Sequence, residues 1–218
     1  MNKTKRIFDV LFAVILLVLL FVPSLIICLI IYIQTKQNPF FIQERGLTLE
    51  TYRFRIIKFR TLKKLSENDL SIRRNNMLHR PYLQEKVFPV GKFLRKTGLD
   101  ELPQLINIIK GEMSIVGPRP LDLIDLKNIK INYPCHYKIR KKLNIKPGLS
   151  GFWQITRNEK RSIEYLIKAD EYYKENQSFL FDVNIIIYSF YILFKGQNKD
   201  AILCKSRINR KLNLKTVE

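Results

Sequence analysis

The stretch around which the sequence is organised reads VGKFLRKTGLDELPQLINIIKGEMSIVGPRPL and covers residues 90–121. Its centre is the carboxylate pair Asp100 and Glu101, and a basic run that includes Arg95 precedes this pair. Near its end, Arg119 lies between two prolines. Acidic groups close to basic groups and to a conformationally restricted arginine are typical of a site that handles a phosphorylated substrate.

A helix is predicted just after the acidic pair. Apolar residues recur at i, i+3, i+4 and i+7 from Leu102 to Ile109, which is the pattern of one helix face. Pro103 is tolerated only in a first turn, so the helix should begin near Asp100 and end at Gly111. The pair would then lie at a helix N-terminus, where N–H groups favour anions. Ordinary helix capping explains acidic residues there as well as a catalytic role does.

The same stretch has the groups that a phosphate and a divalent cation require. Mg²⁺ is usually bound by one or two carboxylates together with phosphate oxygens of the substrate. The prolines on both sides of Arg119 restrict its backbone. A fixed guanidinium suits a bidentate phosphate contact, although a plain rigid turn would have the same sequence.

The composition narrows the class of partner. The chain has 218 residues and a formal net charge of +20, which favours nucleic acid, anionic lipid or phosphorylated small molecules. It has only three cysteines, without paired spacing, and two histidines. A disulfide framework or a zinc cluster is therefore not expected, and a reducing compartment fits best.

A membrane segment is predicted near the N-terminus, because residues 10–33 contain no charged side chain. A helix of this length reaches roughly 36 Å, and the core of a bilayer is about 30 Å thick. The run is too long for the apolar part of a signal peptide. Pro23, followed by Ser24, should kink the helix near its middle. Because basic residues flank both ends, we expect a re-entrant helix broken at Pro23 and Ser24 rather than a straight span.

A short β-hairpin is predicted after the membrane segment. Its strands are the apolar run Phe40 to Gln43 and the aromatic and basic run Thr51 to Arg60, with Gly46 between them. Basic residues such as Lys58 alternate with aromatic ones in the second run. Three interpretations remain open for this pattern: a strand with one solvated face, a phosphate site, or a surface for single-stranded nucleic acid.

The predicted fold class is α+β and predominantly helical, with an N-terminal re-entrant membrane helix, interfacial amphipathic helices and a small β-hairpin or sheet around the active site. We expect a membrane helix over residues 1–36, a cytosolic or interfacial catalytic domain over 37–200, and a basic tail over 201–218. The apolar run 179–194 predicts a core or interfacial helix. The polar segment 63–80 predicts a surface loop.

Short sequence blocks follow one another in order along nearly the whole chain. They are Lys5-Arg-Ile-Phe-Asp9, Gln43-Glu-Arg-Gly46, Ile57-Lys-Phe-Arg-Thr61, Val90-Gly-Lys-Phe-Leu-Arg95, Leu99-Asp-Glu-Leu-Pro-Gln-Leu105, Lys110-Gly-Glu-Met-Ser-Ile-Val-Gly-Pro-Arg-Pro120, Lys146-Pro-Gly-Leu-Ser-Gly-Phe-Trp-Gln154 and Asp170-Glu-Tyr-Tyr173. Each block is weak evidence by itself, but their combined order and spacing are highly specific. Together they resemble the bacterial sugar transferases, in particular the small monotopic polyprenyl-phosphate phosphoglycosyl transferases.

The resemblance implies an enzyme that transfers a sugar-1-phosphate from a UDP-sugar to polyprenyl (undecaprenyl) phosphate and releases UMP. This would be the first membrane step in making a surface glycan, such as an exopolysaccharide, a capsule, an O-antigen or a glycoprotein. The resemblance makes Asp100 the nucleophile that forms a phospho-aspartyl sugar intermediate, and Asp100 and Glu101 the ligands of Mg²⁺. The substrate-binding and phosphate-binding residues that it implies are Lys58, Arg60, Arg95, Arg119 and Asp170.

The resemblance also implies a place and partners. The protein would act at the cytoplasmic face of the bacterial inner membrane on a UDP-sugar and polyprenyl phosphate, in contact with anionic lipid. Downstream glycosyltransferases would be further partners, and nucleic acid would not be one. The competing interpretation is a membrane-tethered nucleic-acid-binding protein, which leaves the acidic pair and the arginine between two prolines without a role.

The chain departs from the family pattern at three points. Val22 precedes Pro23 where the family usually has serine, and Lys146 replaces the usual arginine. Phe152-Trp153 stands where the family usually has Trp-Ala. The last two differences lie in a region that the resemblance places near the nucleotide-sugar, so they bear on which sugar is preferred.

Overall fold

The computed structural model describes residues 3–63, 84–156 and 163–194. Its helical elements are α1 (Lys3–Leu19), α2 (Phe21–Thr35), α4 (Pro89–Thr97), the 3₁₀ turn η2 (Leu99–Glu101), α5 (Gln104–Lys110), α6 (Leu123–Asn132), α7 (Pro134–Lys141), α8 (Phe152–Ile155), α9 (Ile163–Glu175) and α10 (Phe179–Phe194). Its strands are β1 (Phe40–Gly46), β2 (Phe54–Phe59), β3 (Ser114–Val116), β4 (Leu121–Asp122) and β5 (Gly148–Ser150). The described part is mostly helical with small sheets, as predicted for an α+β fold. The predicted tail and nearly all of the predicted loop 63–80 lie outside the described residues.

The predicted hairpin is confirmed. β1 and β2 pair antiparallel from Phe40 opposite Phe59 to Arg45 opposite Phe54. β4 joins the other edge of β1, so the sheet order is β2-β1-β4. A second sheet of β3 and β5 is parallel, which the sequence did not indicate because each of these strands has only three residues.

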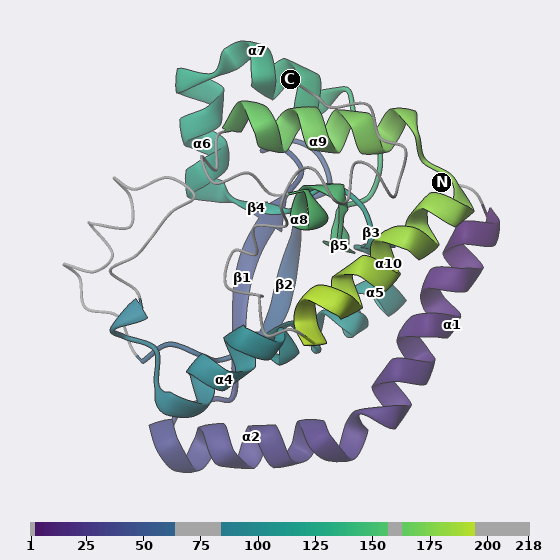
Figure 1. The fold of residues 1–218 in the computed structure, drawn as a ribbon. Coiled ribbons are helices and arrows are strands. Elements are labelled where there is room, and N and C mark those ends of the chain that lie inside the picture. Colours follow the sequence, from purple (N-terminus) through teal and green to yellow (C-terminus); the bar gives the residue numbers. More distant parts are fainter. Residues whose placement is uncertain (1–2, 64–83, 157–162, 195–218) are drawn as a thin grey trace.

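The apolar N-terminal segment is broken into two helices, but the break lies at Leu20, and the predicted break residues Pro23 and Ser24 lie inside α2. α1 and α2 meet at Leu20 with a bend of 62°, and Figure 1 shows them running along one side and then across one end of the molecule. The break lies three residues before Pro23, because a proline lacks the N–H that would bond to the carbonyl of Leu19 and its ring clashes with that carbonyl. Ser24 donates its N–H to the carbonyl of Leu20 at 2.9 Å, which restarts the helix. No single helix among the described residues is long and apolar enough to cross a bilayer, whereas this bent pair passes that test when its two halves are taken together.

The first turns of α1 are fastened to the rest of the fold. Arg6 donates from Nη1 to the carbonyl of Ile108 at 2.6 Å and from Nη2 to the carbonyl of Ile109 at 3.0 Å, at the C-terminal end of α5. The buried Asp9 carboxylate accepts a hydrogen bond from Ser114 Oγ at 2.7 Å. Lys5 Nζ lies 2.5 Å from Asp182 Oδ2, so Lys5 and Arg6, two of the basic residues that precede the apolar run, both have structural partners.

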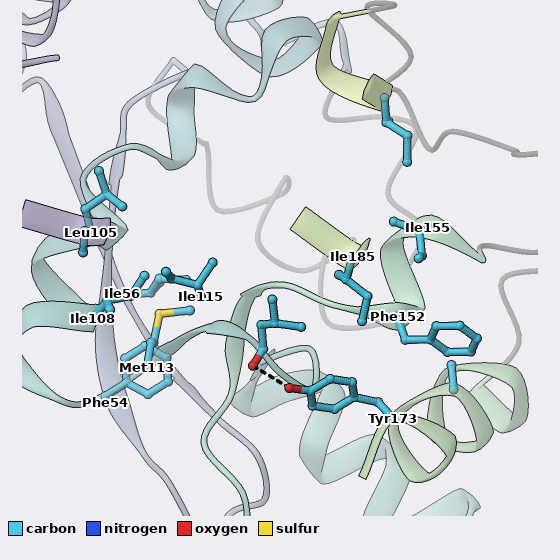
Figure 2. Close-up of a cluster of buried hydrophobic side chains, with 14 residues drawn as sticks. Phe54, Ile56, Leu105, Ile108, Met113, Ile115, Phe152, Ile155, Tyr173 and Ile185 are labelled. Carbon is cyan, nitrogen blue, oxygen red and sulfur yellow. Dashed lines mark hydrogen bonds between the residues drawn. The ribbon is translucent and has the colours of Figure 1, made fainter. Parts of the chain in front are cut away.

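The hydrophobic core lies between the small sheets and the helices. Figure 2 shows its largest cluster, in which Phe54 of β2, Ile108 of α5, Phe152 of α8, Tyr173 of α9 and Ile185 of α10 meet. Five elements from the first, middle and last parts of the described chain therefore share one core. The helix predicted for residues 179–194 is confirmed as α10 and contributes to this core.

A separate small cluster joins the bent helix pair to the elements that carry the basic residues. Ile31 of α2 is fully buried against Phe59 of β2 and against Phe88 and Leu94 around α4. α2 is therefore packed on the strand that carries Lys58 and on the helix that carries Arg95.

Candidate active site

The acidic pair lies in a tight turn rather than in the first turn of the following helix. α4 ends at Gly98, whose φ of 72° is accessible at low cost only to glycine. Asp100 and Glu101 belong to η2, and Pro103 occupies the N-cap position of α5. The predicted start of the helix near Asp100 is thus wrong by one turn, whereas its predicted end at Gly111 is confirmed.

Lys58 of β2 reaches the acidic pair. Its Nζ lies 2.5 Å from Glu101 Oε1, and both side chains are partly buried. The buried Asn107 of α5 holds the two elements in register: its Oδ1 accepts from the N–H of Ile57 and its Nδ2 donates to the carbonyl of Arg55. Asn107 thereby pairs with the outer edge of β2, and this fixes how far Lys58 stands from α5.

The two carboxyl groups have different electrostatic environments. Burial and the charge of Glu101 raise the pKa of Asp100 above its ordinary value of 3.8, against the opposing effects of Lys58 and Arg95. Burial acts to raise the pKa of Glu101 as well, but Lys58, Arg119 and Arg45 outweigh it and lower that pKa. Environments that separate the pKa values of two neighbouring carboxyls are typical of sites in which each carboxyl has its own role.

Arg95 stands beside Asp100 at the end of α4. Its Nε donates to Thr61 Oγ1 at 2.9 Å, just after β2. Burial lowers the pKa of the Arg95 guanidinium, and the neighbouring charge of Asp100 opposes this shift. Arg95 is thus oriented by the chain segment that follows Lys58, and the two cations reach the same pair of carboxylates.

The Arg119 loop is held from behind by a buried ion pair. Arg140 and Asp170 are almost completely inaccessible, and Arg140 Nη1 lies 2.5 Å from Asp170 Oδ2. Arg140 also donates to the carbonyl of Arg119, and Asp170 Oδ1 accepts from the N–H of Arg119 at 3.3 Å. Both main-chain polar groups of Arg119 are therefore fixed, while its guanidinium lies over the ring of Trp153 at 4.3 Å from the centroid.

The structure brings some of the predicted site residues together and separates others. Lys58, Arg95 and Arg119 all act on the acidic pair. Arg60 instead donates to the carbonyls of Asn38 and Phe40 at the start of β1. Asp170 is buried behind the Arg119 loop, with its two oxygens engaged as described above.

Four residues of this region were not among the predicted site residues. Arg45 contributes to the low pKa of Glu101 and donates to the carbonyl of Pro120 at 3.2 Å. The sequence block Gln43 to Gly46 was the available signal for it. Arg140 lies in a run of basic residues and Asn107 in an apolar helix, so neither stands out in the sequence. For Trp153, the available signals were its rarity and its place in a block that the resemblance puts near the nucleotide-sugar.

The donor set fits a divalent cation that also binds substrate. Asp100 and Glu101 supply carboxylate oxygens, the ligands that Mg²⁺ prefers, and Mg²⁺ commonly takes its remaining ligands from phosphates and water. Within the described residues, no group of three or more His, Cys, Asp or Glu side chains is arranged to hold a metal ion. A cation here would therefore depend on the substrate for part of its coordination.

Comparisons with known proteins support one family. The family model described as bacterial sugar transferase matches residues 1–196. A UDP-galactose-lipid carrier transferase of Erwinia amylovora is 30% identical over 88% of this chain and 40% of that protein. The exopolysaccharide production protein ExoY of Sinorhizobium fredii is 34% identical over 84% of this chain and 82% of that protein. A UDP-glucose:undecaprenyl-phosphate glucose-1-phosphate transferase of Escherichia coli is 32% identical over 88% of this chain. The chain spans 40% of the length of the first and third relatives.

Proposed function

This chain belongs to the bacterial sugar transferase family, and we propose that it transfers a sugar-1-phosphate from a UDP-sugar to polyprenyl phosphate with release of UMP. The observation that carries the proposal is the unequal acidic pair, in which Glu101 is tied to Lys58 at 2.5 Å while the pKa of Asp100 is raised. A carboxylate with a raised pKa is the more basic and more nucleophilic member of such a pair. The relatives named above support the substrate class.

The reaction has two steps at one phosphorus atom. In the first, a carboxylate oxygen of Asp100 attacks the phosphorus that carries the sugar, and the bond from this phosphorus to the bridging oxygen breaks, so that UMP leaves with that oxygen. In the second, a phosphate oxygen of the polyprenyl phosphate attacks the same phosphorus. The bond to Asp100 breaks, which regenerates the carboxylate and releases a polyprenyl-diphosphate-sugar. A covalent intermediate divides one difficult displacement into two easier ones.

The surrounding residues supply charge and position, which are the main requirements of phosphoryl transfer. Lys58 keeps Glu101 ionised and in place. Arg95 and Arg119 bind the phosphates of the donor. Asp170 does not touch the substrate; its carboxylate holds the main-chain N–H of Arg119. Arg60 is assigned no contact with the phosphates, because its guanidinium is engaged with the start of β1.

Mg²⁺ held by Asp100 and Glu101 would neutralise charge on the diphosphate of the donor. Its presence would also explain why two carboxylates stand next to each other beside an anionic substrate. The contact with Lys58 restricts the orientation of the Glu101 carboxylate. A restricted carboxylate suits Mg²⁺, because this small cation requires a strict coordination geometry.

The apolar helix pair supports a location at the bacterial inner membrane, on the cytoplasmic face. Its exposed apolar side chains include Leu11, Val18, Phe21 and Leu29. A bent pair that enters and leaves by the same face would put the acidic pair at the level of lipid phosphates. Cysteines introduced at positions 2 and 37 in intact cells test this topology, since labelling of either from outside would exclude a re-entrant helix.

The reaction is tested by UMP release from a panel of UDP-sugars with polyprenyl phosphate as acceptor. We expect UMP release with one or a few UDP-sugars only. Without polyprenyl phosphate, each enzyme molecule should release no more than one UMP, because the acceptor is needed to regenerate the Asp100 carboxylate. Nucleic-acid binding that weakens steeply with salt, without UMP release, would instead favour the competing interpretation. That interpretation needs a row of unengaged basic side chains on and next to β2, whereas Lys58 on β2 and Arg60 directly after it are both bonded within the protein.

A further inference from the structure

The contact between Arg119 and Trp153 has no direct part in the two steps of the proposed reaction. The Arg119 guanidinium carbon lies 4.3 Å from the centroid of the indole. We propose that Trp153 is a positioning residue, a flat support that holds the Arg119 guanidinium in the orientation in which it binds the phosphates of the sugar donor. This inference rests on the proposed function and assigns to that site a residue outside the acidic pair and its cations.

The main chain and the side chain of Arg119 are held by different groups, and Trp153 contacts the side chain. Arg140 and Asp170 fix the carbonyl and the N–H of Arg119, but they leave the torsions of its long side chain undetermined. An aromatic ring that contacts the face of a guanidinium restricts these torsions, and it does not use the N–H groups at the guanidinium edge. Those N–H groups are what a bidentate phosphate contact uses. Stacking and phosphate binding are therefore compatible in one arginine.

The neighbours of Trp153 hold the ring in this place. Trp153 packs against two core clusters, whereas the preceding Phe152 is buried and stacks on Tyr172. A Cβ added to Gly151 would lie 2.4 Å from Trp153 Nε1 and 2.2 Å from the carbonyl oxygen of Gly117. Only glycine at position 151 therefore lets the indole lie against the backbone that leads into the arginine loop.

The choice of tryptophan over another aromatic residue supports a role beyond filling space. Within the described part of the chain, Trp153 Nε1 is buried and has no hydrogen-bond partner. Leaving a buried donor unpaired is unfavourable, and phenylalanine would fill the site without that cost. Indole is, however, the best of the aromatic rings at binding a cation on its face. The ring is thus better explained by the guanidinium above it than by core packing.

Without this support, Arg119 would have a competing partner. Its charge already contributes to the low pKa of Glu101, so the two groups lie within electrostatic reach of each other. A guanidinium released from the ring would be drawn toward this carboxylate and away from the donor phosphates. Loss of Trp153 should therefore act on the use of the sugar donor.

The first test is a double-mutant cycle on UMP release with Trp153→Leu and Arg119→Lys. Trp153→Leu should lower kcat/KM for the sugar donor roughly five- to thirtyfold, the range expected for a cation–π contact, and Trp153→Phe should have an intermediate value, because phenylalanine binds a cation more weakly than indole does. In the Arg119→Lys background, Trp153→Leu should have almost no further effect, because a lysine ammonium has no planar group with paired N–H donors for the ring to orient. Tyr133→Leu, an aromatic-to-leucine change in the neighbouring core cluster, is the matched control and should leave kcat/KM within about twofold.

The second test uses the protein's own fluorescence, since Trp153 is its only tryptophan. Titration of the purified protein with UMP should change the tryptophan emission, and Arg119→Lys should abolish the change. An unchanged emission in the wild type would overturn the inference, as would additive effects in the cycle. This test does not need Trp153→Leu to fold.

The two tests separate this inference from the proposed function. If no UDP-sugar yields UMP, the proposed reaction fails, while the response of Trp153 to UMP still tests the phosphate-binding arrangement. If UMP is released normally but Trp153→Leu behaves as the Tyr133→Leu control does, only the role of Trp153 fails.

Discussion

Lys58 and Glu101 are separated by 43 positions in the sequence, yet the lysine Nζ lies 2.5 Å from a carboxylate oxygen of the glutamate. The contact connects the edge strand of a hairpin to a 3₁₀ turn, and Asn107 of α5, the helix that follows this turn, is hydrogen-bonded to the same strand. It gives two adjacent carboxyls different partners.

Asp100→Asn should abolish UMP release while the protein still folds, because an amide cannot form the acyl-phosphate bond. Glu101→Gln should reduce turnover and retain some of it, since it removes a charge and not the nucleophile. Both variants are compared with wild type by UMP release and by thermal unfolding in detergent. Near-normal turnover of Asp100→Asn would rule out the covalent mechanism.

The rate should fall on acidification at a higher pH than an ordinary aspartate would give. The pKa of Asp100 is raised, so its carboxyl gains a proton, and loses nucleophilicity, above its ordinary value of 3.8. Because the charge of Lys58 lowers this pKa, Lys58→Met should move the acidic limb of kcat/KM to still higher pH. The pH profiles of the two proteins provide the measurement, and an unmoved limb would argue against Asp100 as the titrating group.

Removal of divalent cations should stop UMP release, and added Mg²⁺ should restore it. The physical reason is that two carboxylates next to a diphosphate repel it unless a cation neutralises their charge. The assay is UMP release in excess EDTA, followed by titration with Mg²⁺. Turnover that persists in EDTA would remove the metal from the proposed mechanism.

Arg6→Lys should lower the free energy of unfolding by about 1–2 kcal/mol, because lysine keeps the charge but cannot reach both carbonyls at the end of α5. Denaturant unfolding in detergent measures the change, and Lys3→Gln, at an exposed position of the same turn, is the control. An Arg6→Lys protein as stable as wild type would mean that only the charge at this position matters.

Asp170→Asn should destabilise the fold by about 3–5 kcal/mol, because it leaves the Arg140 guanidinium buried without a counter-charge. Thermal unfolding measures this loss. If Asp170 touched substrate instead, the variant would keep its stability and show only a higher KM for the sugar donor.

The sequence predicted the elements of this fold that have strong local signals. A break in the apolar N-terminal segment follows from one proline, the end of α5 from Gly111, and the hairpin from the apolar and the aromatic and basic runs on each side of Gly46. The parallel pairing of β3 with β5 could not be predicted, because three-residue strands have no periodicity and their pairing depends on the whole core. The position of Asp100 and Glu101 one turn before α5 was missed, since a 3₁₀ turn and a first α-helical turn place similar demands on sequence.

For the candidate site, the sequence indicated the cations that lie near the acidic pair, but not the residues that hold them in place. Lys58, Arg95 and Arg119 lie in sequence blocks near the acidic pair or in a strand with a readable pattern. Arg140 and Asn107 could not be distinguished from sequence, because their roles depend on burial and on backbone groups of distant elements. Arg60 lies only two residues after Lys58, but β2 ends at Phe59, so the side chain turns to the backbone of residues 38–40.

The bend between α1 and α2 has a mechanical consequence. α1 is fastened at its beginning through Arg6 and Asp9, and α2 is packed on the same body through Ile31. Any change of the 62° angle must therefore break contacts at one of these two ends. If the pair inserts into a bilayer, the fold fixes the distance between Asp100 and the bend at Leu20. Bilayers of different thickness must then deform to match this distance.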